Sequence, residues 1–175
     1  MRRPALLLVG AVVLVASVGA AVPAGAPQAA GPAAVAKGRW VITDLGTLGR
    51  AYRDSAASVI NERGQIVGES ATASGKRHPV LWQNGKITHL GTLGGEFSEG
   101  VAINERGQVI GVSVPKGPSV VHAFLWQNGK ITDLGTLGGQ ESDAAAINER
   151  DQIVGVSNTA SGKRHAVLWT LRRGT

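Results

Sequence analysis

Apolar residues after residue 40 come in adjacent pairs and triplets. Examples are Ile66-Val67, Val109-Ile110, Ile153-Val154 and Val80-Leu81-Trp82. A sheet with one face in water would alternate apolar and polar residues, so these doublets indicate strands covered on both faces. No stretch after residue 40 keeps a helical period, and glycines recur every few residues. The pattern predicts an all-β domain.

Turn residues separate these apolar stretches at fixed positions. Asn61-Glu62-Arg63-Gly64 is a four-residue connection of the kind built on a type I turn, and Asn84-Gly85 is a strong hairpin signal. Gly64 and Gly107 can supply the positive φ that closes the first connection, whereas Asp151 adopts it less readily. We therefore expect the third such hairpin to be the least stable. The first unit is predicted to have strands near 57–61, 65–70, 79–83 and 86–90.

The same unit occurs three times. Residues 44–85 return as 89–129 and again as 133–169, and Leu48, Leu93 and Leu137 are 45 and 44 residues apart. This period is typical of repeat proteins, in which each unit buries its apolar face only against its neighbours. The repeat domain covers residues 40–175, with units at about 40–85, 86–129 and 130–175.

Four strands in a unit of about 44 residues are typical of a propeller blade. We expect three four-stranded antiparallel units, forming a partial or three-bladed propeller-like fold. A β-trefoil is the alternative, since it also has three units and twelve strands. Trp40–Leu45 matches the strand after each Asn-Gly turn, and no such strand follows Trp169. The segment Trp40–Leu45 is therefore expected to complete the last sheet, and two copies would make six sheets.

The first residues indicate export. Arg2 and Arg3 precede an uncharged apolar run and a zone of small residues, which is the order found in a secretory signal peptide. We assign residues 1–26 to this signal, with an end between 21 and 36, and residues 27–39 to a disordered linker rich in Ala, Pro and Gly. An uncleaved membrane anchor is the alternative, because the run approaches the length of a span. The protein is expected to be secreted, with no membrane span after cleavage.

Composition adds little chemistry. The chain has no cysteine, so its fold cannot rest on disulfides, and its net charge is +6. Such a charge draws a protein weakly to anionic polymers. No nucleophile elbow, HExxH, P-loop or dinucleotide fingerprint is present. We expect a noncatalytic protein without a cofactor or a specific nucleic-acid partner. A hydrolase or lyase is the less favoured alternative, because propeller loops can assemble a site from distant positions.

Three linked motifs resemble a known family. DLGTLGG, INERGQVIGVS and HAFLW together resemble the HAF repeat of exported bacterial proteins, whose His-Ala-Phe triplet is present as His122-Ala123-Phe124. The resemblance covers residues 42–169. It departs at Arg50, at His89 and in the triplets that begin at His78 and His165. The resemblance implies an extracellular location and a propeller-like repeat, and it supplies no catalytic residue.

Residues that recur in every unit are expected to serve the fold, whereas a single site should use residues that break the symmetry. We interpret three sets as structural: Trp82, Trp126 and Trp169; Asn61, Asn104 and Asn148; Gly68, Gly111 and Gly155. The tryptophans are expected between sheets, the asparagines in turns, and the glycines where a neighbouring sheet comes close. A metal site formed by His78, His122 and His165 is a less favoured hypothesis, so no metal is expected.

Two identical basic loops are the candidate binding site. They contain Lys76, Arg77 and His78 in the first unit, and Lys163, Arg164 and His165 in the third. Arg offers a bidentate fork and Lys a point charge for a phosphate or carboxylate. The sequence thus predicts an exported binding or interaction module for an anionic surface polymer or a protein. The alternative is a structural unit that completes a larger propeller by forming a homodimer.

Overall fold

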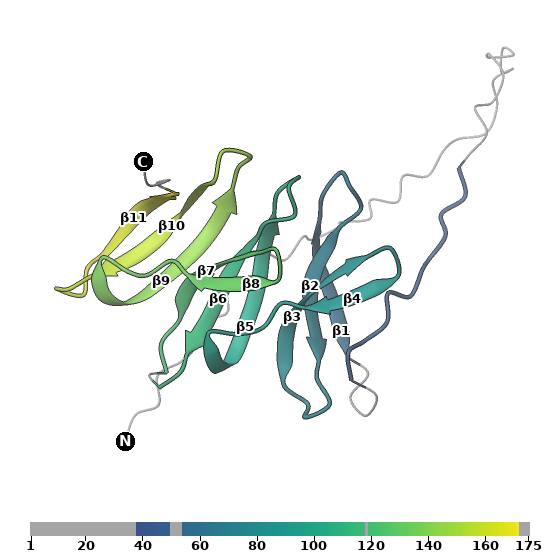
Figure 1. Cartoon of the computed structure of the whole chain (residues 1–175), viewed down its shortest axis with the longest axis horizontal. Helices are drawn as coiled ribbons and strands as arrows, with labels where there is room; N and C mark the ends of the chain where they lie inside the picture. The colour runs from purple at the N-terminus through teal and green to yellow at the C-terminus, as the bar shows by residue number, and fades with distance from the viewer. Residues whose placement is uncertain (1–37, 50–53, 118, 172–175) are drawn as a thin grey trace, which may run out of the picture. The chain divides into compact units, whose positions relative to one another are not determined.

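The computed structural model describes residues 38–49, 54–117 and 119–171. The expected signal peptide (1–26) and nearly all of the expected linker (27–39) lie outside these residues. The described residues contain no helix and form eleven strands in three open antiparallel sheets (Figure 1). The all-β prediction is confirmed. No helix in this part of the chain has the length and apolar character needed to cross a membrane.

Each unit of the repeat forms one sheet. Sheet A consists of β1 (Ser55–Ile60), β2 (Ile66–Ala71), β3 (Arg77–Gln83) and β4 (Lys86–His89), paired in that order. Sheet B consists of β5 (Gly94–Ile103), β6 (Val109–Pro115), β7 (His122–Gln127) and β8 (Lys130–Asp133), also in chain order. Sheet C consists of β9 (Gly138–Ile147), β10 (Gln152–Thr159) and β11 (Arg164–Thr170), with β10 in the centre.

Sheet C differs from the expectation of three four-stranded units. Within the described ranges it has three strands, because Trp40–Leu45 forms no strand and does not pair with β11. Trp40 is 97% exposed and Ile42 is 98% exposed. Its match to the strand after each Asn-Gly turn predicted a strand here, but a strand also needs a partner edge, and none meets it among the described residues.

The hairpin turns have the predicted backbone conformation. Gly64 and Gly107 have φ of 70° and 76°, and Asp151 in the third copy has φ of 59°. The Asp151 carboxylate accepts hydrogen bonds from the side chains of Arg106 and Gln108 in the preceding unit. The strain of a left-handed Asp is therefore offset by contacts that glycine cannot make.

Adjacent sheets share apolar cores. Val67 and Leu81 of sheet A pack with Phe124 and Trp126 of sheet B. A second cluster joins sheets B and C. It contains Ile110, Ala123, Ala144 and Ile153. Because each sheet covers its neighbour's face, both faces of sheet B are buried, which explains the apolar doublets.

The recurring strand glycines have a different cause from the one predicted. A Cβ on Gly68 would lie 2.0 Å from the carbonyl oxygen of Ala56, and one on Gly111 would lie 1.9 Å from that of Glu99. These atoms belong to the paired strand of the same sheet, where the register shifts by a β-bulge. The expectation of a neighbouring sheet close to these glycines is wrong, because the bulge itself brings the backbone close.

Candidate functional site

The basic loop of the first unit is neutralised by carboxylates of this chain. Lys76 forms an ion pair with Glu96 of sheet B. Arg77 forms ion pairs with Asp54 and Glu69, and both carboxylates raise its pKa. A cation that already has two carboxylate partners offers little to an external anion.

The equivalent loop of the third unit keeps more of its charge available. Lys163 is exposed, and no ion pair joins it to any residue that the structure describes. Arg164 is 67% exposed, and its guanidinium nitrogen lies 4.0 Å from the carboxylate of Asp143. The two loops have the same sequence but different surroundings, so the third unit is the stronger candidate for binding.

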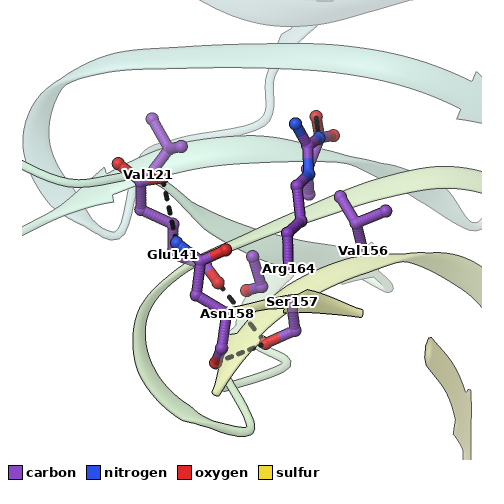
Figure 2. Close-up of a pocket in the computed structure, with 8 residues that line it drawn as sticks. Val121, Glu141, Val156, Ser157, Asn158 and Arg164 are labelled. Atoms are coloured by element: carbon purple, nitrogen blue, oxygen red, sulfur yellow. Dashed lines mark hydrogen bonds and ion pairs between the residues drawn. The ribbon is translucent and has the colours of Figure 1, made fainter. Parts of the chain in front are cut away.

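A polar cleft lies beside the basic loop of the third unit, between sheet C and the segment before β7 (Figure 2). Its volume is about 190 Å³. It is lined by Val121, Glu141, Ser142, Asp143, Val156, Ser157, Asn158 and Arg164. Three strands supply most of these side chains, since Glu141 comes from β9, Asn158 from β10 and Arg164 from β11.

Hydrogen bonds hold the polar wall of the cleft. The side-chain amide of Asn158 donates to Glu141 Oε2 at 3.3 Å. The Ser157 hydroxyl donates to the Glu141 carbonyl at 3.4 Å, and the Ser142 N–H donates to the carbonyl of Val121 at 3.0 Å. The last bond ties sheet C to the segment before β7. The cleft therefore has hydrogen-bond acceptors on one side and a guanidinium on the other.

The cleft breaks the symmetry of the repeat. In the second unit, Phe97 stands where the third unit has Glu141, and Val114 stands where it has Asn158. Glu99 takes the place of Asp143, and burial raises the pKa of Glu99, with smaller contributions from Glu69 and Asp143. Two positions that are apolar in the second unit are thus polar in the third unit, where they line the cleft.

His78, which belongs to the first basic loop, pairs with a second histidine. Its Nδ1 lies 2.8 Å from Nε2 of His89, and the two rings stack with centroids 4.9 Å apart. In the second unit, His122 instead pairs with the carboxylate of Asp133 at 2.8 Å. His165 of the third unit is exposed. The three equivalent histidines do not converge, and no group of three metal-ligating side chains occurs in the described ranges.

The histidine pair predicts a pH effect. Burial lowers the pKa of His78, with contributions from His89 and Lys76, and burial also lowers the pKa of His89. The unfolded chain then takes up protons first, so the free energy of unfolding should fall as the pH drops below about 6.5. We expect His89→Asp, which copies the pair of the second unit, to reduce the fall in melting temperature between about pH 7 and about pH 5.5. An unchanged fall would contradict this.

The exposed His165 provides the control for this experiment. A His165→Asn variant removes one histidine without touching the stacked pair. At about 1 μM protein, where single chains are compared, its melting temperature should follow the same pH profile as the unmodified protein. A change as large as that of His89→Asp would show that the pair is not the cause.

The recurring tryptophans and asparagines lie at the interfaces. Trp82 and Trp126 are buried at 4% and 8% exposure, and Trp169 is half-buried against the second core. The buried indole nitrogen of Trp82 has no hydrogen-bond partner among the described residues. The burial of Trp82 and Trp126 leaves neither of these indoles exposed for stacking on a sugar.

No family model, curated protein or solved structure matches this chain. The HAF-repeat resemblance therefore remains a prediction. Sequence reasoning identified Arg164 and Lys163 but missed Glu141 and Asn158. The signal was present, because these two residues replace Phe97 and Val114 of the second unit.

Proposed function

We propose that this protein is an exported, noncatalytic binding module whose ligand is an anionic polysaccharide. The observation that carries the proposal is the symmetry-breaking cleft of the third unit beside Lys163 and Arg164. The leader-like residues 1–26 and the HAF-type motifs support export, and the three sheets in chain order support a propeller-like arrangement over a trefoil.

The groups around the cleft fit a sugar that carries an acid. Glu141 and Asp143 can accept hydrogen bonds from sugar hydroxyls, while the amide of Asn158 can both donate and accept. Arg164 and Lys163 can hold a carboxylate or sulfate of the same chain. The cleft is small and open, so it suits one residue of a long polymer rather than an enclosed small molecule.

Binding is tested by comparing the two identical loops. We expect Lys163→Ala with Arg164→Ala to weaken binding to an acidic polysaccharide such as a polyuronate by about tenfold or more, as measured by titration calorimetry at about 0.15 M salt. The matched control is Lys76→Ala with Arg77→Ala, whose cations are already paired with Glu96, Asp54 and Glu69. This control removes the same net charge, but its two cations already have carboxylate partners. Its effect on binding should therefore be less than about threefold.

Equal losses in the two double variants would point to net charge rather than a site, and would contradict the assignment. A second variant tests the cleft itself. Glu141→Phe with Asn158→Val restores the residues of the second unit and leaves every cation in place. It should weaken binding of the polyuronate. Unchanged binding would show that the cleft takes no part.

A further inference from the structure

Hydrogen bonds that join successive sheets repeat from one unit to the next. The side-chain amide of Asn61 donates to the carbonyl of Asn104 at 2.9 Å, and that of Asn104 donates to the carbonyl of Asn148 at 3.1 Å. The N–H of Glu62 donates to the carboxylate of Glu105 at 2.9 Å, and the same bond recurs one unit later at 2.7 Å. Each unit therefore has a donor side toward the next unit and an acceptor side toward the one before.

The two outer ends of this series are complementary. Within the described residues, the side-chain amide of Asn148 donates only inside its own turn, to Gln152, and the N–H of Glu149 has no partner. At the other end, no other unit donates to the Asn61 carbonyl or to the Glu62 carboxylate in the same part of the chain. The donors left over on sheet C match the acceptors left over on sheet A.

The outer face of sheet C shows apolar residues that its counterparts bury. Val67 and Ile110 are 0% exposed under the next sheet, whereas the equivalent Val154 is 46% exposed. Leu81 is 5% exposed, whereas the equivalent Leu168 is 57% exposed. This face has the composition of an interface and lacks the covering sheet.

The outer face of sheet A shows the converse. In sheet C, Ser142 and Ala144 are 2% and 1% exposed where sheet B covers them. Their equivalents in β1, Ser55 and Ala57, are exposed, and the neighbouring Ile60 is 63% exposed. Sheet A thus has small residues in place for a preceding sheet to approach.

A segment with the sequence of a strand is unpaired, and one edge of sheet C lacks the strand that its counterpart has. Residues 42–49 have the same sequence, ITDLGTLG, as residues 131–138. In the latter, Ile131 and Thr132 of β8 pair with Trp126 and Leu125 of β7. The matching residues 42–44 form no strand, and β11, the counterpart of β7, pairs only with β10 among the described strands.

An apolar groove lies where the side chain of such a strand would enter. Ile131 of β8 packs on the core between sheets A and B, beside Trp126. At the next interface the corresponding place is a groove of about 400 Å³. Its apolar lining is Leu125, Leu134, Ile147, Ile153, Trp169 and Leu171. Ile42, the counterpart of Ile131, is 98% exposed and would fill this groove.

A polar contact can also form at this edge of sheet C, between Asp44 and His165. Asp44 Oδ1 accepts a hydrogen bond from the N–H of Gly46 at 2.9 Å, which is the turn that Asp133 also forms. The other oxygen of Asp133 then pairs with His122. By the same register, Oδ2 of Asp44 would meet the exposed His165 on β11.

We propose that two copies of this chain associate head to tail, with sheet C of each copy packed on sheet A of the other. Ile42–Asp44 of one copy adds as the fourth strand of the other copy's sheet C, along β11. Such an interface joins two different faces of the chain. It gives a closed ring when the rotation that relates the two copies brings the second copy back onto the first. Two copies give six sheets, which lies within the range of about four to eight that closed propellers have. Val156 and Asn158 of the proposed polysaccharide cleft lie on the same face of sheet C as Val154, so the two proposals are tested with separate variants.

The register is tested by cross-linking, because the chain has no cysteine of its own. By analogy with β7 and β8, Thr43 should lie opposite Leu168 of the other copy. Mixing a Thr43→Cys variant with a Leu168→Cys variant under mild oxidation should give a covalent heterodimer on a non-reducing gel. Ile42→Cys mixed with Leu168→Cys is the matched control, since a shift of one residue turns the side chain to the opposite face. Equal yields from the two mixtures would overturn the register.

The association itself is tested by sedimentation of the purified protein. The expected mass is twice that of one chain, and Thr43→Pro should raise the dissociation constant at least about tenfold, since proline removes a ladder N–H. Arg39→Pro, outside the pairing segment, is the control. A monomer at about 100 μM, or a dimer that Thr43→Pro leaves unchanged, would overturn the proposal. Retained polyuronate binding in Thr43→Pro would show that binding and assembly are separate.

Discussion

Gly111→Ala is expected to prevent the protein from folding stably. Gly111 lies in β6, the second strand of sheet B, and a Cβ there would lie 1.9 Å from the carbonyl oxygen of Glu99 and 2.9 Å from Cε1 of Phe124. The backbone carbonyl cannot rotate away without opening the bulge between β5 and β6, and Phe124 is fully buried. We expect a loss of about 4 kcal/mol or more, which is a large part of the stability of a small domain.

A different glycine separates close approach from backbone conformation. Gly64 has φ of 70°, and nothing lies within 4 Å of a Cβ placed on it. Gly64→Ala should therefore cost only the left-handed conformation, about 1 kcal/mol. Both variants are measured by urea denaturation, monitored by tryptophan fluorescence. If Gly111→Ala lost no more stability than Gly64→Ala, the bulge would not be the reason for glycine in this strand.

Local turn chemistry explains why most strand positions could be predicted. The four-residue turn Asn61–Gly64 and the two-residue turn Asn84-Gly85 fix where strands end, and β2, β3 and β4 begin and end within two residues of the prediction. These turns depend on residues next to each other in the sequence. For that reason the pattern of one unit was enough to place them in the others.

Long-range pairing explains what could not be predicted. In the second unit, the counterpart of the strand predicted near 57–61 would begin near residue 100. β5 instead begins at Gly94, because Gly94 pairs with Pro115 across the sheet. The pair Gly94-Gly95 indicates a turn when the sequence is read alone. Pairing with the neighbouring strand β6 is what makes these two residues part of the sheet. The strand predicted at Trp40–Leu45 does not form for the opposite reason. Its sequence matches a strand of the repeat, but no sheet edge pairs with it among the described residues.

The candidate site was predicted only in part for a similar reason. The identity of the two basic loops made them look equivalent, but their partners come from distant positions. Arg77 pairs with Asp54, which lies 23 residues before it. Arg164 meets Asp143, which replaces an alanine of the first unit. The charge of a loop can be read from its own residues, whereas its neutralisation depends on the strands that the fold brings beside it.

Asn104→Ala is expected to cost about 3 kcal/mol, and Asn148→Ala about half as much, although the two residues occupy the same position of the repeat. Asn104 Oδ1 accepts hydrogen bonds from the N–H groups of Arg106 and Gln108 at 3.1 and 3.0 Å. Asn148 makes the same turn bonds, but only Asn104 also donates to the next sheet. Asn104 is 4% exposed, so the backbone groups that lose their hydrogen bonds in Asn104→Ala are buried.

The difference between these two variants depends on what covers sheet C. In a single chain the amide of Asn148 has no intersheet acceptor among the described residues, so thermal unfolding at about 1 μM should separate the variants by about 1.5 kcal/mol. In a head-to-tail pair, the Asn61 carbonyl of the other copy becomes that acceptor. Raising the concentration to about 100 μM should then stabilise the unmodified protein more than Asn148→Ala. If both gained equally, the asparagine series would end within one chain and would take no part in joining two.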